Sequence, residues 1–315
     1  MAIDSVGPQE RVVGKSQIVV VVPALNERDS IGQVIDGIKE AMKDTDCRVL
    51  VVDGNSKDGT ADEAKKHGAQ VIKQRRRGYG DGLLYGFTYA NSYLSPQILV
   101  MIDADGTYDP ANIPRLVEPI IKDEADVVIG NRFPQMDEGS MTLTNRVGNR
   151  IISWVARNSL GIKISDTQCG MRALRAELAE ELSGQVEGMA FATEMLVDLS
   201  QVRARVVDVP IAYHCRVGET KLNPFRDGAG IVGTTLRLMR DYRPLVFFGA
   251  LGAIVTLAGL VIGSDVISEW LTTGTVTRVP TAILTVLLVV IGIQLFSLGL
   301  IADMIKGVKK RRSYL

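Results

Sequence analysis

Short apolar runs alternate with stretches of helical periodicity along the first 130 residues of the chain. The apolar runs are rich in Val and Ile and predict buried strands, and the residues between them repeat apolar positions every three to four residues, as amphipathic helices do. The predicted strands are residues 18–22, 48–52, 69–72, 98–102 and 127–129, and the predicted helices are residues 31–42, 61–67, 82–92 and 113–121. Continuous apolar strands separated by helices predict an α/β domain whose parallel sheet is covered on both faces.

The pattern changes after residue 243, where two long apolar stretches follow. Residues 244–263 and 279–302 hold no charged residue, and a helix of either length would cross the roughly 30 Å hydrocarbon core of a bilayer. We therefore expect two transmembrane helices, and a pair of buried core helices is the alternative interpretation. Residues 228–243 mix arginines with Leu, Ile and Met, which favours an amphipathic helix on the membrane surface over an ordinary surface helix.

Basic residues are unevenly distributed around these two stretches. The connecting residues 264–278 hold one basic residue, Arg278. The flanks hold Arg237, Arg240 and Arg243 before the first stretch, and Lys306, Lys309, Lys310, Arg311 and Arg312 after the second. Because cytoplasmic loops of membrane proteins carry an excess of Lys and Arg, both flanks are expected in the cytoplasm and the connection outside it.

The charge balance and the cysteines argue against several classes of protein. The 315 residues include 36 Lys and Arg against 36 Asp and Glu, and a net charge of zero argues against a nucleic-acid partner held by bulk electrostatics. Cys47, Cys169 and Cys215 are widely spaced and predict reduced thiols in a cytosolic domain rather than disulfides or a zinc site. The polar residues 1–16 do not resemble a signal peptide, which agrees with a cytosolic domain.

Acidic side chains follow the predicted strand 98–102. Ligands of parallel sheets bind at the carboxyl ends of the strands, and Asp103 and Asp105, separated by Ala104, come at such an end. Carboxylate oxygens are ligands that Mg²⁺ and Mn²⁺ prefer, and Mg²⁺ commonly binds substrate phosphates as well. An Asp-x-Asp sequence also occurs in many turns, so these residues alone leave a metal site and a plain turn open.

A second group of candidates follows the strands 18–22 and 48–52. Asp53 comes directly after a buried strand and before a glycine, where a carboxylate can accept hydrogen bonds from a nucleotide base or ribose. The alternative is a tight loop in which Asp58 or Thr60 caps the next helix, and the two roles are compatible. Residues 23–27 either shape a nucleotide pocket or only turn the chain into the helix that follows.

Three of these segments together resemble a known enzyme family. They read Pro-Ala-Leu-Asn-Glu at 23–27, Val-Val-Asp-Gly-Asn-Ser-Lys-Asp-Gly-Thr at 51–60, and Met-Ile-Asp-Ala-Asp-Gly-Thr-Tyr-Asp-Pro at 101–110. In this order and spacing they resemble the family 2 glycosyltransferases, which have the GT-A fold. The chain has no Gln-x-x-Arg-Trp sequence, which the processive polysaccharide synthases of that family carry, so a polymerase is not expected.

Three further segments narrow the resemblance. Gly-Asn-Arg-Phe at 130–133, Asp-Thr-Gln-Cys-Gly-Met-Arg at 166–172 and Arg-Val-Gly-Glu-Thr-Lys-Leu at 216–222 look like the polyprenyl-phosphate glycosyl synthases. Dolichyl-phosphate mannose and glucose synthases belong to that group. The resemblance covers residues 17–243, and two C-terminal apolar stretches agree with the membrane-anchored members.

The resemblance implies a fold and a reaction. The expected fold is an α/β GT-A domain, a Rossmann-like domain that binds nucleotide sugars, followed by two transmembrane helices. The expected reaction moves one hexose, with inversion, from GDP-mannose or UDP-glucose to dolichyl or polyprenyl phosphate, and so supplies lipid-linked sugar for protein glycosylation. Mg²⁺ or Mn²⁺ is the expected cofactor. An N-acetylhexosamine donor, or a catalytically silent scaffold with the same fold, is the alternative.

The resemblance also implies roles for individual residues. Asp53 would bind the base or ribose, and Asp103 and Asp105 would serve the sugar, the diphosphate and the metal ion. The acceptor phosphate is already an anion and needs no general base, so arginines would hold it close to the donor diphosphate. The nucleotide-sugar candidates are Pro23, Ala24, Asn26, Glu27, Asp53, Asn55, Asp58, Gly78, Gly80 and Ala104; the metal candidates are Asp105 and Asp103; the acceptor-phosphate candidates are Arg132, Arg146, Arg216 and Lys221; and the catalytic candidates are Asp103, Asp105, Arg132 and Arg216.

Four other polar residues are weaker candidates. Asp166 and Gln168 precede a glycine and are expected beside the sugar. Glu194 and Asp198 are four residues apart on a helical pattern, where such a pair either binds a metal ion or, as we favour, pairs with basic groups. By the resemblance, Glu194 would lie near the acceptor.

The organisation of the whole chain follows from these expectations. We expect a flexible N-terminus at 1–16, a catalytic domain at 17–227, an interfacial helix at 228–243, a transmembrane hairpin at 244–305 and a basic cytosolic tail at 306–315. The expected partners are a nucleotide sugar, polyprenyl phosphate and the lipid bilayer, and not nucleic acid; a homo-oligomer is compatible with the sequence. The protein is expected to be an integral membrane protein with its catalytic domain on the cytoplasmic face.

Overall fold

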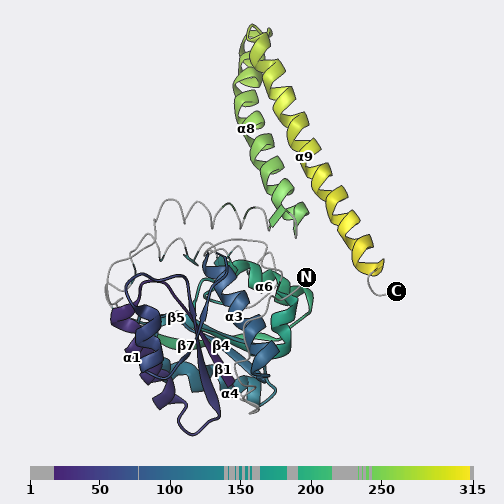
Figure 1. The fold of residues 1–315 in the computed structure, drawn as a ribbon. Coiled ribbons are helices and arrows are strands. Elements are labelled where there is room, and N and C mark those ends of the chain that lie inside the picture. Colours follow the sequence, from purple (N-terminus) through teal and green to yellow (C-terminus); the bar gives the residue numbers. More distant parts are fainter. Residues whose placement is uncertain are drawn as a thin grey trace. The chain divides into compact units, whose positions relative to one another are not determined.

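The chain forms two compact units, Met1–Val232 and Gly233–Leu315, in a computed structural model. The structure describes residues 18–76, 78–137, 164–182, 191–214 and 243–312, together with residues 141, 146, 149, 150, 153, 154, 157, 233, 236, 239 and 240. The first unit holds a sheet with helices packed on it, and the second holds two long helices (Figure 1).

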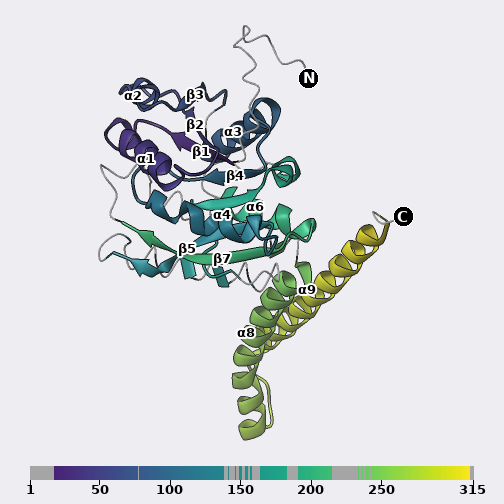
Figure 2. The ribbon, with the colours of Figure 1, turned by 90° about the horizontal axis from the view of Figure 1, so that it is seen from below.

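A seven-stranded sheet is the centre of the described part of the first unit. The strands are β1 (Ile18–Ala24), β2 (Cys47–Asp53), β3 (Gln70–Lys73), β4 (Ile98–Met101), β5 (Val127–Met136), β6 (Arg172–Arg175) and β7 (Val206–Tyr213). Their order is β3-β2-β1-β4-β6-β5-β7, which can be followed from β3 to β7 in Figure 2. The first four strands in this order are parallel, β6 is antiparallel to both of its neighbours, and β7 is parallel to β5.

Helices cover both faces of this sheet. They are α1 (Arg28–Ala41), α2 (Thr60–Lys66), α3 (Tyr79–Tyr93), α4 (Ile113–Ile121) and α6 (Phe191–Gln201), with the short 3₁₀ helices η1 (Pro110–Asn112) and η2 (Ala176–Glu181). Crossovers between parallel strands are right-handed. The chain advances from β1 to β3 through α1 and α2 and returns to β4 through α3, so α1 and α3 lie on opposite sides of the strands (Figure 1).

This burial on both faces explains the continuous apolar runs of the central strands. Every residue from Ile18 to Val22 in β1 is fully buried, and all of β4 is buried. The covering helices are amphipathic instead: α4 buries Ile113, Leu116 and Ile120, at the spacing of one helix face, and exposes Ile121. The strands therefore end in fixed positions, and the loops at their carboxyl ends are anchored on a packed core.

The predicted strands and helices are found, with ends that differ by up to three residues, except that β5 runs to Met136, seven residues past its predicted end. The expectation of a parallel sheet is wrong at β6. The apolar pattern predicts neither β6 nor β7. β6 begins with Arg172, which is fully buried among backbone carbonyls, and ends with Arg175, which pairs with Asp126. Carbonyls and a carboxylate from other parts of the chain bind the arginines of β6. The strand therefore has no apolar run from which it could be predicted.

The second unit is a helical hairpin of α8 (Pro244–Thr273) and α9 (Val279–Arg312). Pro244–Thr273 and Val279–Ile305 are long and apolar enough to cross a membrane, and only 11 % of the most apolar window of each is buried here, which contradicts the alternative of core helices. α8 continues past residue 263 and ends at Gly274, whose φ of 70° is in the left-handed region that favours glycine. The predicted connection 264–278 is therefore too long.

Parts of three expected segments lie outside the described residues. These are the N-terminal residues 1–17, most of the expected interfacial helix 228–243, and the last residues of the basic tail. Within the interfacial segment, residues 233, 236, 239 and 240 are helical. The proposed boundaries of these segments therefore stay predictions.

Small residues let α8 and α9 approach closely. A Cβ at Gly252 would lie 2.5 Å from the carbonyl oxygen of Gly292, whereas a Cβ at Gly249 would meet the ring of Phe296 at an ordinary 3.6 Å. We expect Gly252→Ala to destabilise the hairpin by about 1–3 kcal/mol, because a backbone atom cannot move aside. The matched variant Gly249→Ala is expected to unfold like wild type. Thermal unfolding of the two variants in detergent, followed by circular dichroism, tests this difference.

An exposed ionic cluster joins the ends of β5, β6 and β7. Asp126 accepts hydrogen bonds from Arg205 and Arg175, and those from Arg205 are the main reason why the pKa of Asp126 falls to about 2. A carboxyl whose pKa is lowered by folding stabilises the fold above its unfolded pKa of about 3.9 and loses that contribution as the pH falls toward 2. We expect a loss of about 1 kcal/mol, because solvent screens this cluster. Urea unfolding at pH 5 and pH 3 should show a loss of stability that is larger by this amount for wild type than for Asp126→Asn, because other carboxyls such as Asp123 also have lowered pKa values.

Candidate functional site

The loops after β1 and β2 are tied to each other. Ala24 is paired with Asp53 across the two strands, so β1 and β2 end at the same level. The Asn26 side chain accepts a hydrogen bond from the Lys57 N–H (2.8 Å), and the Asn26 N–H donates to the Ser56 hydroxyl (2.9 Å). The structure thus brings together several predicted nucleotide-sugar residues at one edge of the sheet: Pro23, Ala24, Asn26, Glu27, Asp53, Asn55 and Asp58.

Asp58 holds the start of α2. Its carboxylate accepts hydrogen bonds from the Thr60 N–H (3.0 Å), the Thr60 hydroxyl (2.5 Å) and the Arg28 N–H (3.1 Å). Desolvation opposes them, but these hydrogen bonds lower the pKa of Asp58 and keep it ionised. The N-cap of α2 is Gly59, without a side-chain cap, so the expected capping by Asp58 or Thr60 is not found. Asp58 instead holds the loop before the helix, and its contact with a nucleotide stays a prediction.

Two glycines at the start of α3 are required by the local geometry: Gly78 comes just before the helix, and Gly80 lies in its first turn. The buried Gln74 donates to the carbonyl of Gly78 (2.6 Å), and Gly78 has a φ of 120°, which L side chains rarely adopt. A Cβ at Gly80 would lie 2.8 Å from the Cβ of Phe191 on α6. Both glycines are therefore explained by chain geometry, and their contact with the donor stays a prediction.

The carboxylates of Asp103 and Asp105 lie after β4 at the same edge. Asp103 Oδ1 accepts a hydrogen bond of 2.7 Å from the Tyr79 hydroxyl. Burial raises the pKa of Tyr79 well above its usual value, so this hydroxyl keeps its proton and donates. Asp105 Oδ1 accepts from the Thr107 N–H (3.1 Å) and hydroxyl (2.6 Å). Each carboxylate is thus oriented by a neighbouring donor.

The same loop is fixed from two sides. The Ser30 hydroxyl of α1 donates to the carbonyl of Ala104 (2.7 Å). On the other side, Gly170 lies so close to Asp103 that any side chain at 170 would collide with the carboxylate, and the Gly170 N–H donates to the Tyr108 hydroxyl (2.7 Å). Glycine at 170 is therefore needed for the approach of this turn to Asp103.

Arg132 of β5 forms a buried ion pair with Asp166. Nε donates to Oδ2 (2.6 Å) and Nη2 to Oδ1 (2.9 Å), and the guanidinium lies over the ring of Tyr213 at 5.2 Å. Desolvation lowers the pKa of Arg132, but the electrostatic interactions with Tyr108 and Asp166 and the hydrogen bonds to Asp166 outweigh it, and the net pKa is raised. Asp166 is fully buried and lies against Arg132, and its expected place beside the sugar stays a prediction.

Arg172 anchors the turn that carries Asp166 and Gly170. Its guanidinium donates to the carbonyls of Cys169 (2.9 Å), Thr167 (2.8 Å) and Ala192 (2.9 Å). Burial lowers the pKa of Arg172, and three carbonyl acceptors satisfy the donors of this buried group. Because Ala192 belongs to α6, Arg172 connects the turn to that helix.

The remaining predicted residues either have few described contacts or lie outside the described part of the chain. Arg146 is helical and half-buried, and its Nε is a buried donor with no hydrogen-bond partner among the residues that the structure describes. Glu194 and Asp198 are both buried on α6. Arg216 and Lys221 lie outside the described residues, so the structure does not place them against Arg132.

The carboxylates after β4 fit a divalent cation that is completed by the substrate. Mg²⁺ is commonly bound by one or two carboxylates, waters and substrate phosphates rather than by a full set of protein ligands. Within the described ranges, no group of three or more His, Cys, Asp or Glu side chains is arranged to hold a metal ion. Asp103 and Asp105 therefore match the donor set of a metal–diphosphate site and not that of a closed structural site.

Sequence reasoning does not identify several residues that shape this edge. Tyr79 orients Asp103, Thr107 orients Asp105, and Arg172 anchors the 166–172 turn. The signals were weak: Tyr79 stands between two glycines, and Thr107 lies two residues after Asp105. Their partners come from other elements or from the local turn, so only the folded chain shows which groups they contact.

The fold and this edge define a class of protein. The parallel strands β3-β2-β1-β4, followed by the antiparallel β6, have the arrangement of the GT-A fold. The model of the glycosyl transferase family 2 matches residues 19–183. The chain belongs to this family and is a glycosyltransferase.

Relatives and solved structures agree with this assignment. Glycosyltransferase AglJ from Haloferax volcanii is 30 % identical over 94 % of this chain and 95 % of AglJ. The dolichyl-phosphate hexose transferase of that organism is 34 % identical over 72 % and 95 %, and the undecaprenyl-phosphate mannosyltransferase of Micrococcus luteus 29 % over 70 % and 93 %. Glucosyl-3-phosphoglycerate synthase from Mycobacterium tuberculosis superposes with a TM-score of 0.58 at 24 % identity, over 71 % of this chain and 80 % of the synthase.

Proposed function

We propose that this enzyme transfers one hexose from a nucleotide sugar to a polyprenyl phosphate, with inversion at the anomeric carbon. The observation that carries the proposal is the meeting, at one edge of the sheet, of the Asp103–Asp105 loop with the buried Arg132–Asp166 pair. The Asp103–Asp105 loop suits a metal-bound donor diphosphate, and Arg132 brings a cation toward an acceptor phosphate. Relatives named as a dolichyl-phosphate hexose transferase and an undecaprenyl-phosphate mannosyltransferase support this acceptor class.

In the proposed reaction an oxygen of the acceptor phosphate attacks the anomeric carbon of the donor sugar. The new carbon–oxygen bond forms as the bond to the diphosphate breaks, and the nucleoside diphosphate leaves with the electron pair. The attacking oxygen carries no proton, so none of the side chains has to act as a general base. The protein's contribution is to position two anions and to stabilise the charge that moves onto the diphosphate.

Individual residues take these tasks in the proposal. Asp53, at the end of β2, binds the base or ribose, and Asp103 and Asp105 hold the sugar and a divalent ion. Such an ion, when bound, neutralises the leaving diphosphate. A complex of the mycobacterial glucosyl-3-phosphoglycerate synthase, 25 % identical, contains Mn²⁺ and UDP, which supports a metal-bound nucleoside diphosphate in this fold.

The acceptor phosphate is assigned to Arg132, Arg146, Arg216 and Lys221. Two N–H groups of Arg132 already bind Asp166, so Arg132 would reach a phosphate through its other N–H groups. The buried Nε of Arg146 without an acceptor in the described part of the chain supports an anion beside it, because an unsatisfied buried donor is costly.

Arg216→Ala is expected to impair acceptor use more than donor binding. A charge-assisted hydrogen bond contributes roughly 1.5–3 kcal/mol, which corresponds to about a ten- to hundredfold lower kcat/KM for polyprenyl phosphate. Arg216→Lys should restore only part of this, because an ammonium group cannot make the bidentate contact. Calorimetry of the donor and kinetics of the acceptor separate the two effects. A collapse of donor affinity with normal acceptor kinetics would assign Arg216 to the diphosphate instead.

The two apolar helices suggest membrane anchoring, and we propose that α8 and α9 cross the bilayer with both flanks and the catalytic domain in the cytoplasm. This places the enzyme on the leaflet where its lipid acceptor presents the phosphate. A cysteine introduced at Thr275, in the short connection, should react with an impermeant thiol reagent from outside intact cells in a chain whose native cysteines are replaced. Labelling only after lysis would contradict the topology.

One experiment tests the proposed function directly. The purified full chain in detergent is incubated with Mg²⁺ or Mn²⁺, a short polyprenyl phosphate and each of a panel of nucleotide sugars that includes N-acetylhexosamine donors. Mass spectrometry should show one added hexose on the lipid, and NMR of the product should show an inverted anomeric configuration. A lipid that stays unmodified with every donor, or one that gains several sugars, would contradict the proposal.

A further inference from the structure

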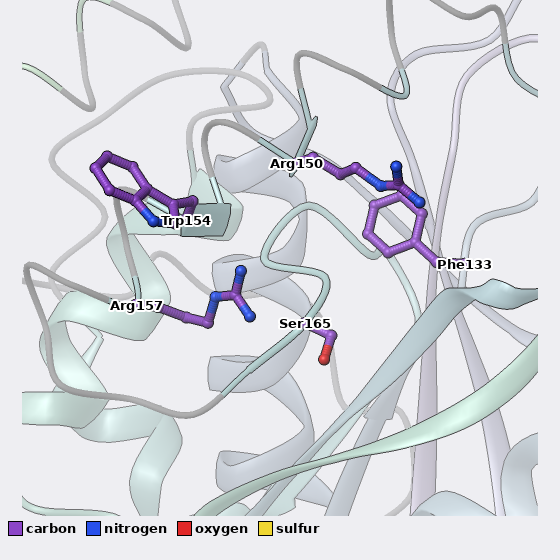
Figure 3. A pocket seen from close by; sticks show the side chains of 5 residues that line it. All are labelled: Phe133, Arg150, Trp154, Arg157 and Ser165. Carbon is purple, nitrogen blue, oxygen red and sulfur yellow. The ribbon is translucent and has the colours of Figure 1, made fainter.

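A cavity of about 620 Å³ lies beside β5, and the site described above does not use it. Its lining residues are Phe133, Arg150, Trp154, Arg157 and Ser165. Figure 3 shows Trp154 and Arg157 on one side, Phe133 with Arg150 on the other, and Ser165 between them. Phe133 follows Arg132 in β5, in the stretch between Asn131 and Gln135 where the pairing with β7 is irregular. The cavity is therefore adjacent to the Arg132–Asp166 pair, and neither member of that pair lines it.

Three of the five lining residues lie on one face of a helix. Arg150, Trp154 and Arg157 are four and three residues apart and helical, which places them side by side on one face. The next face is anchored in the domain: Ser153 is buried, and its hydroxyl accepts a hydrogen bond of 3.1 Å from the Thr167 N–H. The cationic face is thus held at a defined position on the first unit.

The lining is cationic and aromatic, without an acidic residue among the five. The Arg150 guanidinium lies over the ring of Phe133 at 5.7 Å, which holds its planar fork in one orientation. The Ser165 hydroxyl adds a neutral donor. The Asp208 carboxylate accepts a hydrogen bond from the Ser165 N–H (3.0 Å). Asp208 therefore contacts the backbone of Ser165 and is not one of the five lining residues. Two guanidinium groups and a hydroxyl around one space suit the oxygens of a phosphate.

Trp154 indicates where that phosphate comes from. This side chain is 59 % exposed, and tryptophan combines a large apolar ring with one polar N–H, a combination that is enriched where proteins meet the headgroups of a bilayer. Arginines near an anionic leaflet are attracted to its headgroups. The same chain carries two helices of membrane length, so the first unit is tethered to the structure that holds such headgroups.

We propose that this cavity binds the phosphodiester headgroup of an anionic membrane phospholipid, as a site distinct from that of the acceptor phosphate. Arg150 and Arg157 bind the phosphate oxygens, and Trp154 inserts its ring beside the acyl chains. The headgroup would hold this helix against the bilayer, one helical turn beyond Arg146. The inference rests on the proposed membrane anchoring and not on the transfer reaction, so a binding measurement can test it whatever the donor or acceptor is.

The test uses Trp154 as its own reporter. The chain has two tryptophans, so Trp270→Phe leaves Trp154 as the single source of indole fluorescence in the full chain. This variant, in micelles of a zwitterionic detergent, is titrated with dihexanoyl-phosphatidylglycerol. We expect the emission of Trp154 to change and to saturate as phosphatidylglycerol is added. Dihexanoyl-phosphatidylcholine and inorganic phosphate should bind with an apparent affinity at least tenfold weaker. Arg150→Gln with Arg157→Gln should weaken phosphatidylglycerol binding at least tenfold.

A matched control removes the same charge elsewhere. Lys43 and Arg48 line a different cavity on the first unit, and Lys43→Gln with Arg48→Gln should leave the titration unchanged. The proposal is overturned if phosphatidylcholine binds as well as phosphatidylglycerol, or if the control pair weakens binding equally. It is also overturned if a short polyprenyl phosphate competes for the Trp154 signal, because the cavity would then belong to the acceptor site. Circular dichroism of all variants establishes that each is folded.

Discussion

Asp105→Asn should lower turnover by several orders of magnitude while the protein stays folded. Asp105 lies in a partly exposed loop after β4, and its Oδ1 accepts hydrogen bonds from the N–H and hydroxyl of Thr107. An asparagine Oδ1 can accept both, so the loop keeps its shape and only the negative charge is lost. If that charge helps to hold a divalent ion on the diphosphate, its loss removes stabilisation of the leaving group.

The measurement is kcat for the lipid acceptor at saturating donor, together with thermal unfolding. Asp109 provides a matched control, because it lies in the same loop and its carboxylate accepts only a local hydrogen bond from the Ala111 N–H (2.9 Å). Asp109→Asn should keep kcat within a few-fold of wild type. Excess chelator should inactivate wild type, and added Mg²⁺ or Mn²⁺ should restore it. Full activity of Asp105→Asn, or of wild type in chelator, contradicts the metal role.

The parts of the fold that follow from the sequence are those in which local pattern and tertiary burial agree. β1 and β4 are buried on both faces and are therefore apolar throughout, and α4 is buried on one face and is therefore amphipathic. β6 is the opposite case, since its arginines are neutralised by carbonyls and by Asp126 from other elements. A pattern of single residues cannot contain that information, because the compensating groups are distant in the sequence.

In the candidate site, too, some features follow from the sequence and others do not. The positions of Asp53, Asp103 and Asp105 follow from strand ends, since the carboxyl ends of parallel strands meet at one edge. The partners of these residues do not follow. The expectation places Arg132 at a phosphate, and it does not include Asp166, from a turn 34 residues later, which binds two side-chain N–H groups of Arg132. The sequence motifs therefore identify which residues gather at the edge and not how their charges are paired.

Breaking the buried Arg132–Asp166 ion pair is expected to have the largest effect on stability. Arg132 is 6 % exposed and Asp166 0 %, so Asp166→Ala would leave a guanidinium buried without its counter-ion. Removing one partner of a buried ion pair commonly costs about 3–5 kcal/mol, whereas replacing both partners by apolar residues of similar volume is often neutral. Asp166→Ala should therefore unfold at a clearly lower urea concentration. The double variant Arg132→Met with Asp166→Leu should recover part of the difference, because the buried backbone N–H groups of Arg132 and Gln168 still lose Asp166 as their acceptor.

Asp123 is the matched control for this comparison. It pairs with Arg205 at the surface, and its side chain is 74 % exposed, so Asp123→Ala should unfold at nearly the same urea concentration as wild type. Urea unfolding of the full chain in detergent, followed by circular dichroism, measures wild type, Asp166→Ala, the double variant and the control. The double variant should be stable yet inactive, because it lacks the cation proposed for the acceptor phosphate. A double variant as unstable as Asp166→Ala would mean that packing around Tyr213 and Tyr108, and not the uncompensated charge, is what Asp166→Ala disrupts.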